Sequence, residues 1–99
     1  MPELLDEAQR TALLATLPHW TFCPETPGCK ACIKTTIQTG NFLAGLALVT
    51  KIAVRAEQAD HHPDVLLTYP RVQISLSTHD AGGITAKDIE LARDIDRLR

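Results

Sequence analysis

Three of the four histidines in this 99-residue chain fall at two places, the pair His61-His62 and the single His79. Imidazole gains and loses a proton near neutral pH, so a group of histidines suits acid–base catalysis. Two carboxylates accompany them. Glu57 precedes His61 by four residues, which predicts that both lie on one face of a helix's last turn, and Asp88 follows His79. These residue types favour a proton-transfer site if the fold brings them together.

The segment between the two histidine positions decides whether they meet. Two short runs, 65–68 and 72–77, are expected as strands joined at Tyr69-Pro70, and the second alternates apolar with polar residues. If they form an antiparallel hairpin, the chain returns level with its starting point near residue 78. His79 is then expected beside the histidine pair. A short glycine loop follows, which keeps the next helix, with Asp88, close by.

The first part of the chain predicts a helix and then a hairpin. Residues 4–17 carry an apolar stripe of helical spacing, which Pro18 ends. Residues 20–22 and 31–39 are expected as strands on either side of a turn region at 24–28. The second of these strands is mostly β-branched at alternate positions, as a half-buried strand requires.

Two further helices complete the pattern. Asn41 is expected to cap a long second helix. Its core-facing stripe is expected at steps of three and four residues: Phe42, Leu46, Val49, Ala53 and Ala56. The interior Gly45 is expected to let another element approach closely. Gly82-Gly83 marks a loop, after which Thr85 and Asp88 form a capping box that opens the third helix.

The element order is therefore αββαββα in a single domain, residues 1–99. Antiparallel hairpins then predict an α+β fold. Its four-stranded antiparallel sheet has the helices packed on one face.

Composition excludes several classes of function. The formal net charge is −2 with Lys and Arg scattered along the chain, so no basic stripe exists to bind nucleic acid directly. The longest apolar run, 42–49, is far too short to span a membrane. The N-terminus lacks a signal-peptide pattern, and three cysteines are an odd number for a disulfide framework. We therefore expect a reduced, cytoplasmic protein.

Metal sites are the main alternative to acid–base chemistry. His61 and His62 are adjacent, with one expected to be helical and the other extended, and no HxxxH or HxH spacing occurs, so we expect no metal there. The cysteines form the pattern Cys23-x5-Cys29-x2-Cys32, to which His19 could add a fourth zinc ligand. We favour the simpler interpretation of small apolar residues around a hairpin turn.

Together these residues resemble the signature of the pterin-4a-carbinolamine dehydratases. The matching positions are Glu57-x3-His61-His62-Pro63, then Tyr69, His79 and Asp88, and the likeness is strong from about residue 42 onward. The αββαββα order is also that of the family. The first hairpin departs from it, because the second strand has Ile and Thr where the family usually carries aromatic residues.

The resemblance implies loss of water from a 4a-hydroxytetrahydropterin, with no cofactor. It implies that His61, His62 and His79 are the catalytic residues: His61 and His79 transfer protons, in an order left open, and His62 holds the substrate and charge. Asp88 would orient His79, and Glu57 would orient His61 or bind the pterin. Ser77 and Thr78 would hydrogen-bond the pterin edge.

The resemblance also implies a homodimer or homotetramer. The alternative function is a non-catalytic protein on the same fold, either an assembly factor or a companion of a transcription factor. An inactive descendant would be expected to lose its histidines, so the presence of all three favours the enzyme.

Overall fold

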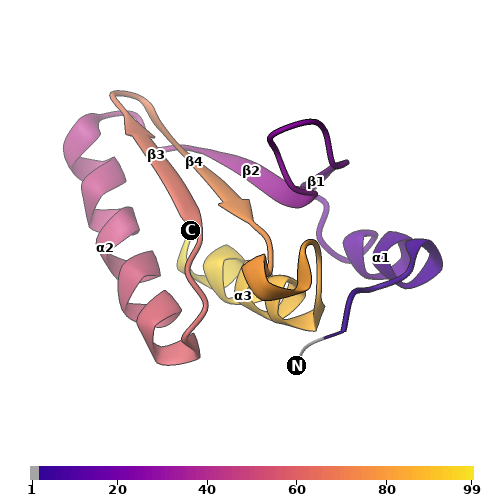
Figure 1. Ribbon diagram of the computed structural model, residues 1–99. Helices are drawn as coiled ribbons and strands as arrows, with labels where there is room; N and C mark the ends of the chain where they lie inside the picture. The colour runs from indigo at the N-terminus through magenta and orange to yellow at the C-terminus, as the bar shows by residue number, and fades with distance from the viewer. Residues whose placement is uncertain (1–2) are drawn as a thin grey trace.

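The computed structural model describes residues 3–99 and shows an antiparallel sheet with strand order β1-β2-β4-β3 (Figure 1). The elements, in chain order, are α1 (Glu7–Leu14), β1 (Thr21–Cys23), β2 (Cys32–Gln38), α2 (Phe42–Ala59), β3 (Asp64–Thr68), β4 (Arg71–Leu76), a short 3-10 helix η1 (His79–Ala81) and α3 (Ala86–Leu98). The predicted α+β class and αββαββα order are confirmed. No helix in residues 3–99 is both long and apolar enough to cross a membrane.

Alternating side chains give the sheet a covered face and an open face. On β4, Val72, Ile74 and Leu76 are buried under the helices, whereas Gln73 and Ser75 lie on the opposite side. The strand β2 alternates in the same way. Both α2 and α3 contribute to the core that covers one face. The strand boundaries agree with the predicted ones to within one residue. The face of the sheet opposite α2 and α3 carries the polar side chains and can line a site.

The stripe of α2 that faces the core differs from the predicted stripe. The buried residues of α2 are Gly45, Leu48, Ile52 and Ala56. Of the predicted stripe, Phe42 and Leu46 are instead 51% and 46% exposed. Because α2 is apolar on two sides, its periodicity does not decide which side meets the sheet. Gly45 favours the observed side, since a Cβ there would lie 2.6 Å from Leu67 Cδ1. The predicted close approach at this glycine is thus confirmed.

The first helix is shorter than the predicted span 4–17. Leu5 donates its N–H to the Ile84 carbonyl at 2.9 Å, so the chain is still extended at this point. Asp6 then caps the helix, and its Oδ1 accepts from the Gln9 N–H at 2.7 Å. Pairing with a distant segment therefore replaces the first helical turn that the apolar spacing predicts.

Candidate active site

His61 lies just beyond the end of α2. Asp60 adopts a left-handed conformation (φ 50°, ψ 43°), and the His61 N–H donates to the Ala56 carbonyl at 3.1 Å. This arrangement satisfies carbonyls at the helix end and turns the chain away from the helix axis. The expectation that His61 belongs to the last helical turn is therefore wrong, because Asp60 redirects the chain before it.

The His61 imidazole pairs with Asp88 inside the protein. Its Nε2 lies 2.6 Å from Asp88 Oδ1, and the two side chains are 10% and 0% exposed. The other carboxylate oxygen accepts from the Thr78 hydroxyl at 2.8 Å and from the Thr85 N–H at 2.9 Å. A buried carboxylate is costly unless it is paired and hydrogen-bonded. Two distant partners, His61 and Thr78, and the N-cap of its own helix, Thr85, satisfy Asp88 and hold it in one position.

Asp88 also determines which nitrogen of His61 is free to react. An ionised carboxylate only accepts hydrogen bonds, so we assign the hydrogen between the two groups to His61 Nε2 on the basis of its partner. Nδ1 of His61 then carries a lone pair, and because Asp88 contacts Nε2, this lone pair can accept a proton. A carboxylate that fixes the tautomer of a histidine in this way is a common arrangement for acid–base chemistry.

The partners of Asp88 and Glu57 differ from those that the resemblance implies. Asp88 holds His61 rather than His79, and Glu57 Oε2 lies 3.3 Å from His62 Nε2 rather than beside His61. The side chains of His62 and Glu57 are 57% and 77% exposed, so water screens this contact. Both differences have one cause. Because α2 ends early, His61 turns toward α3 and leaves His62 beside the last helical turn.

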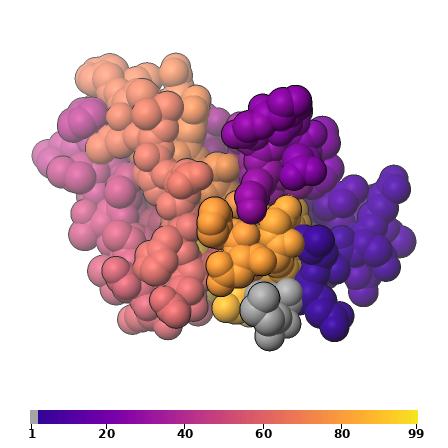
Figure 2. Space-filling model, viewed as in Figure 1, coloured from indigo at the N-terminus to yellow at the C-terminus, as the bar shows by residue number. Residues whose placement is uncertain are grey.

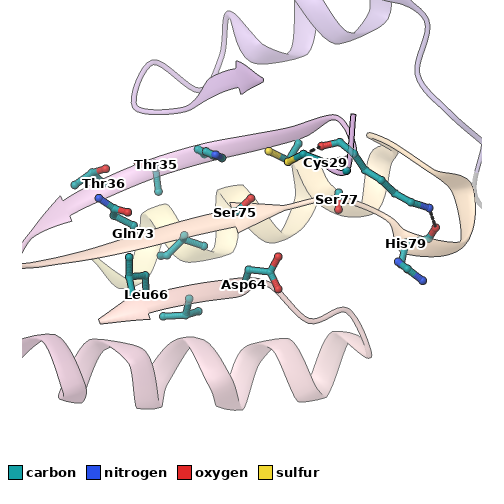
Figure 3. Close-up of a pocket in the computed structure, with 15 residues that line it drawn as sticks. Cys29, Thr35, Thr36, Asp64, Leu66, Gln73, Ser75, Ser77 and His79 are labelled. Atoms are coloured by element: carbon teal, nitrogen blue, oxygen red, sulfur yellow. Dashed lines mark hydrogen bonds between the residues drawn. The ribbon is translucent and has the colours of Figure 1, made fainter. Parts of the chain in front are cut away.

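Ser77 and His79 line a groove of about 700 Å³ on the open face of the sheet. Its floor is formed by polar side chains of β2 and β4 together with Asp64, Val65 and Leu66 of β3 (Figure 3). The β1–β2 turn forms one rim, and Lys30 from this turn donates to the His79 carbonyl at 3.4 Å. In Figure 2 the turn stands apart from the β3–β4 hairpin, with a hollow between them. The groove is open and large enough for a small planar molecule.

The register of the β3–β4 hairpin brings His79 to the same end as the histidine pair. Asp64 pairs with Ser75, so continuing the two strands brings Thr78 level with His61. Both of these residues contact the shared Asp88. No hydrogen bond within residues 3–99 joins the three imidazoles to one another. His79 faces the large groove, whereas His62 lines a smaller cavity of about 160 Å³ beside α2.

Sequence reasoning missed the role of Thr85. Its hydroxyl lies 2.6 Å from the Thr78 hydroxyl, and both residues are buried. The capping box of Thr85 and Asp88 indicates a helix start from the sequence, but the Asp88 carboxylate of this box also holds His61. Asp88 belongs both to the capping box and to the residues that resemble the family. This double occurrence is the one sequence signal that links the capping box to the site. The Thr78 hydroxyl donates to Asp88, and Thr78 is not among the residues that line the groove.

Solved structures share this arrangement of helices and strands. A crystal structure of a transcriptional coactivator/pterin dehydratase from Brucella melitensis matches with a TM-score of 0.86 at 28% identity, covering 95% of this chain and 96% of that chain. A pterin dehydratase-like protein identified as a RuBisCO assembly factor in the alpha-carboxysome matches with a TM-score of 0.64 at 18% identity, covering 80% and 87%. This second likeness concerns the fold alone.

Sequence comparison identifies the family. The family model described as Pterin 4 alpha carbinolamine dehydratase matches residues 3–98. A relative from Nocardia farcinica named "Putative pterin-4-alpha-carbinolamine dehydratase" is 44% identical over 96 residues, which cover 97% of this chain and 95% of the relative. The chain belongs to the pterin 4 alpha carbinolamine dehydratase family.

Proposed function

We propose that this protein removes water from 4a-hydroxytetrahydropterin and yields the quinonoid dihydropterin, as a 4a-hydroxytetrahydrobiopterin dehydratase does in pterin recycling. The C4a hydroxyl must gain a proton to leave as water, and N5 must lose one. The C4a–O bond breaks and a C4a=N5 double bond forms, so the protein has to supply only a proton donor and a proton acceptor. Family membership over residues 3–98 supports a dehydratase, and the observation that carries the proposal is the buried pair of His61 and Asp88.

His61 and His79 are the proposed proton-transfer residues. The carboxylate of Asp88 leaves Nδ1 of His61 available, and His79 lines the groove on the open face. Either histidine can act as the acid and the other as the base. A well-placed general acid or base contributes about 10²- to 10⁴-fold to a rate.

The remaining residues bind or position. His62 lines the smaller cavity beside α2 rather than the groove, so we assign it to the part of the substrate that extends beyond the groove toward α2, and Glu57 acts through it. Ser77 lines the groove and hydrogen-bonds the flat pterin edge. Because the Thr78 hydroxyl already donates to Asp88, we assign Thr78 to positioning that carboxylate rather than to contacting substrate through its side chain.

The test is the dehydration rate of chemically generated 4a-hydroxytetrahydropterin. We expect the wild type to accelerate it, and His61→Ala and His79→Ala each to lose about 10²-fold or more in kcat. The matched control is His19→Ala, the same substitution at an exposed histidine outside the site, which should keep the wild-type rate. If wild type and buffer give the same rate, the dehydratase proposal is wrong and the non-catalytic binding function takes its place.

We also propose that the chain self-associates as a homodimer or homotetramer. The outer side of α2 carries Leu43 and Val54, which are 74% and 56% exposed, in addition to Phe42 and Leu46. An apolar helix face of this kind is typical of a surface that another chain covers. Sedimentation velocity should show an oligomer for the wild type and a monomer for Leu43→Glu, whereas a monomeric wild type would contradict the proposal.

A further inference from the structure

Three thiols surround the β1–β2 turn, and the dehydration chemistry uses none of them. Cys23 ends β1, Cys32 begins β2, and Cys29 lies in the turn between them. All three are free thiols. No group of three or more His, Cys, Asp or Glu side chains in the described part of the chain is arranged to hold a metal ion. The chemistry open to three free thiols at one turn is thiol–disulfide exchange.

Cys23 and Cys32 are direct cross-strand partners in the antiparallel β1–β2 pair. Opposed residues in such a pair have Cα atoms about 4.5 or 5.5 Å apart, depending on their hydrogen bonding. A disulfide requires Cα atoms about 4.4–6.8 Å apart. The two side chains also leave the sheet on the same face because the residues are directly opposed. The register therefore places the two thiols at a backbone spacing that a disulfide can bridge.

The turn that joins the two strands is already closed. Thr26 and Cys29 exchange backbone hydrogen bonds, each 2.9 Å long. Between them Gly28 has a φ of 80°, a left-handed conformation that glycine adopts without strain. Oxidation of Cys23 and Cys32 would thus not require the hairpin to rearrange, which is the usual reason that a plausible disulfide fails to form.

The three thiols differ in how an oxidant reaches them. Cys29 is exposed, Cys23 is half-buried and Cys32 is buried. Burial raises the pKa of the Cys23 thiol, and the neighbouring Cys32 raises it further, while Lys34 acts in the opposite direction. A thiol must ionise to attack a disulfide, so Cys23 is slow to react directly with a molecule from solution, and burial shields Cys32 from such a molecule. Cys29 is the accessible thiol.

We propose that Cys23 and Cys32 form a reversible cross-strand disulfide, for which the oxidant is a low-molecular-weight disulfide such as oxidised glutathione and Cys29 is the entry point. The Cys29 thiolate attacks the oxidant, breaks its S–S bond and releases one thiol. The Cys32 thiolate then displaces the second thiol from Cys29. Finally, Cys23 attacks Cys32 and returns Cys29 to its reduced form. Overall, two protein thiols are oxidised and one small disulfide is reduced to two thiols.

The disulfide would act on the rim of the groove. Cys29, Lys30 and Cys32 line the groove together with His79, and Lys30 already donates to the His79 carbonyl (Figure 3). The strand β1 is three residues long and, within residues 3–99, pairs with β2 alone. A covalent link at its end would hold this short edge strand, and with it the turn, in one position.

The test equilibrates the reduced full-length protein with mixtures of reduced and oxidised glutathione, followed by alkylation and peptide mapping. We expect one intramolecular disulfide that joins Cys23 to Cys32, with Cys29 alkylated, and complete reversal by excess reduced glutathione. Amide hydrogen exchange in β1 should slow in the oxidised form. An oxidised product limited to glutathionylated Cys29, or to a Cys29–Cys32 bond, would overturn the proposal.

Two variants separate the roles. Cys29→Ser should form the same disulfide about tenfold more slowly or slower still, because the remaining thiols are shielded, and should reach the same equilibrium. Cys23→Ser should form no disulfide to Cys32 other than one from Cys29. If Cys29→Ser reacts as fast as the wild type, the entry role of Cys29 is wrong. Circular dichroism of each reduced variant establishes that it is folded. If a variant fails to fold, the wild-type peptide map still tests the Cys23–Cys32 disulfide.

Discussion

Asp88→Asn is the substitution that most directly tests how the site is held. Asparagine keeps the size of the side chain and one acceptor oxygen, which can still accept from Thr78 and Thr85. Its amide nitrogen then faces His61 Nε2, and an amide N–H only donates. Nε2 of His61 must therefore accept, which moves the imidazole hydrogen to Nδ1. The nitrogen that we assign to proton exchange loses its lone pair.

The expected loss of rate follows from the loss of one acid–base group. Such groups contribute about 10²- to 10⁴-fold, which is about 2.7–5.4 kcal/mol at about 1.36 kcal/mol per tenfold. The loss of stability is smaller, because a hydrogen bond to a charged group (about 1.5–3 kcal/mol) is replaced by a neutral one (about 0.5–1.5 kcal/mol). A decrease of about 1 kcal/mol lowers Tm by about 4–8 °C in a domain of this size. The variant should therefore fold and still be inactive.

Alanine would be a poorer choice at this position. Asp88→Ala would leave three donors without an acceptor in the interior. Each costs about 1–3 kcal/mol, and the sum of about 3–9 kcal/mol is comparable to the whole stability of a domain. Loss of activity would then only report unfolding.

Two measurements check the reasoning on Asp88→Asn. Dehydration kinetics should show the fall in kcat, and ¹⁵N NMR of the imidazole should show that the His61 hydrogen has moved from Nε2 to Nδ1. The matched control is Asp6→Asn, since Asp6 also caps a helix and asparagine caps equally well. A variant that is inactive while its His61 tautomer is unchanged refutes the tautomer argument. A variant with the wild-type rate refutes the role of Asp88.

Three further predictions concern stability and thiol chemistry. Thr78→Val removes a hydroxyl that donates to a buried carboxylate, and should lower the free energy of unfolding in urea by about 1–3 kcal/mol; an unchanged midpoint would contradict this. Gly45→Ala should change the free energy of unfolding by less than about 1 kcal/mol, because the helix propensity that alanine adds offsets the cost of moving the end of the Leu67 side chain; a larger change in either direction would contradict this. Since burial raises the pKa of Cys23, its alkylation rate should rise at a higher pH in the folded chain than in the urea-unfolded chain, and identical pH profiles would exclude this shift.

The order of elements could be predicted from the sequence because its signals are local. Alternation along β4, the Asn41 cap and the Thr85 capping box depend only on neighbouring residues, and all three occur in the structure. The errors in the fold arise where a distant segment competes with a local pattern. Leu5 pairs with Ile84 rather than joining α1. The rotation of α2 about its axis depends on how it packs against the sheet. Because α2 is apolar on two sides, the spacing of its apolar residues does not specify which side is buried.

The sequence predicted which residues lie at the site better than it predicted which carboxylate contacts which histidine. Hairpin geometry indicates that His79 returns to the level of the histidine pair, and the β3–β4 register agrees with this. Which carboxylate meets which imidazole depends on a single residue, the left-handed Asp60, which decides that His61 points to α3. Aspartate tolerates that conformation more readily than most residues, but nothing in the local sequence requires it.

The position of Asp88 in the first turn of α3 explains why a buried carboxylate is tolerated at this point. Its oxygen accepts the Thr85 N–H, which a helix start leaves without an intrahelical partner, so the charge satisfies a donor that would otherwise need water. The positive end of the helix dipole favours the same negative charge. Thr78, at the end of β4, supplies the second donor, and only the third contact, to His61, faces the proposed chemistry. The helix cap and the strand end thus fix the carboxylate independently of any ligand, and the orientation of His61 follows from the fold rather than from substrate binding.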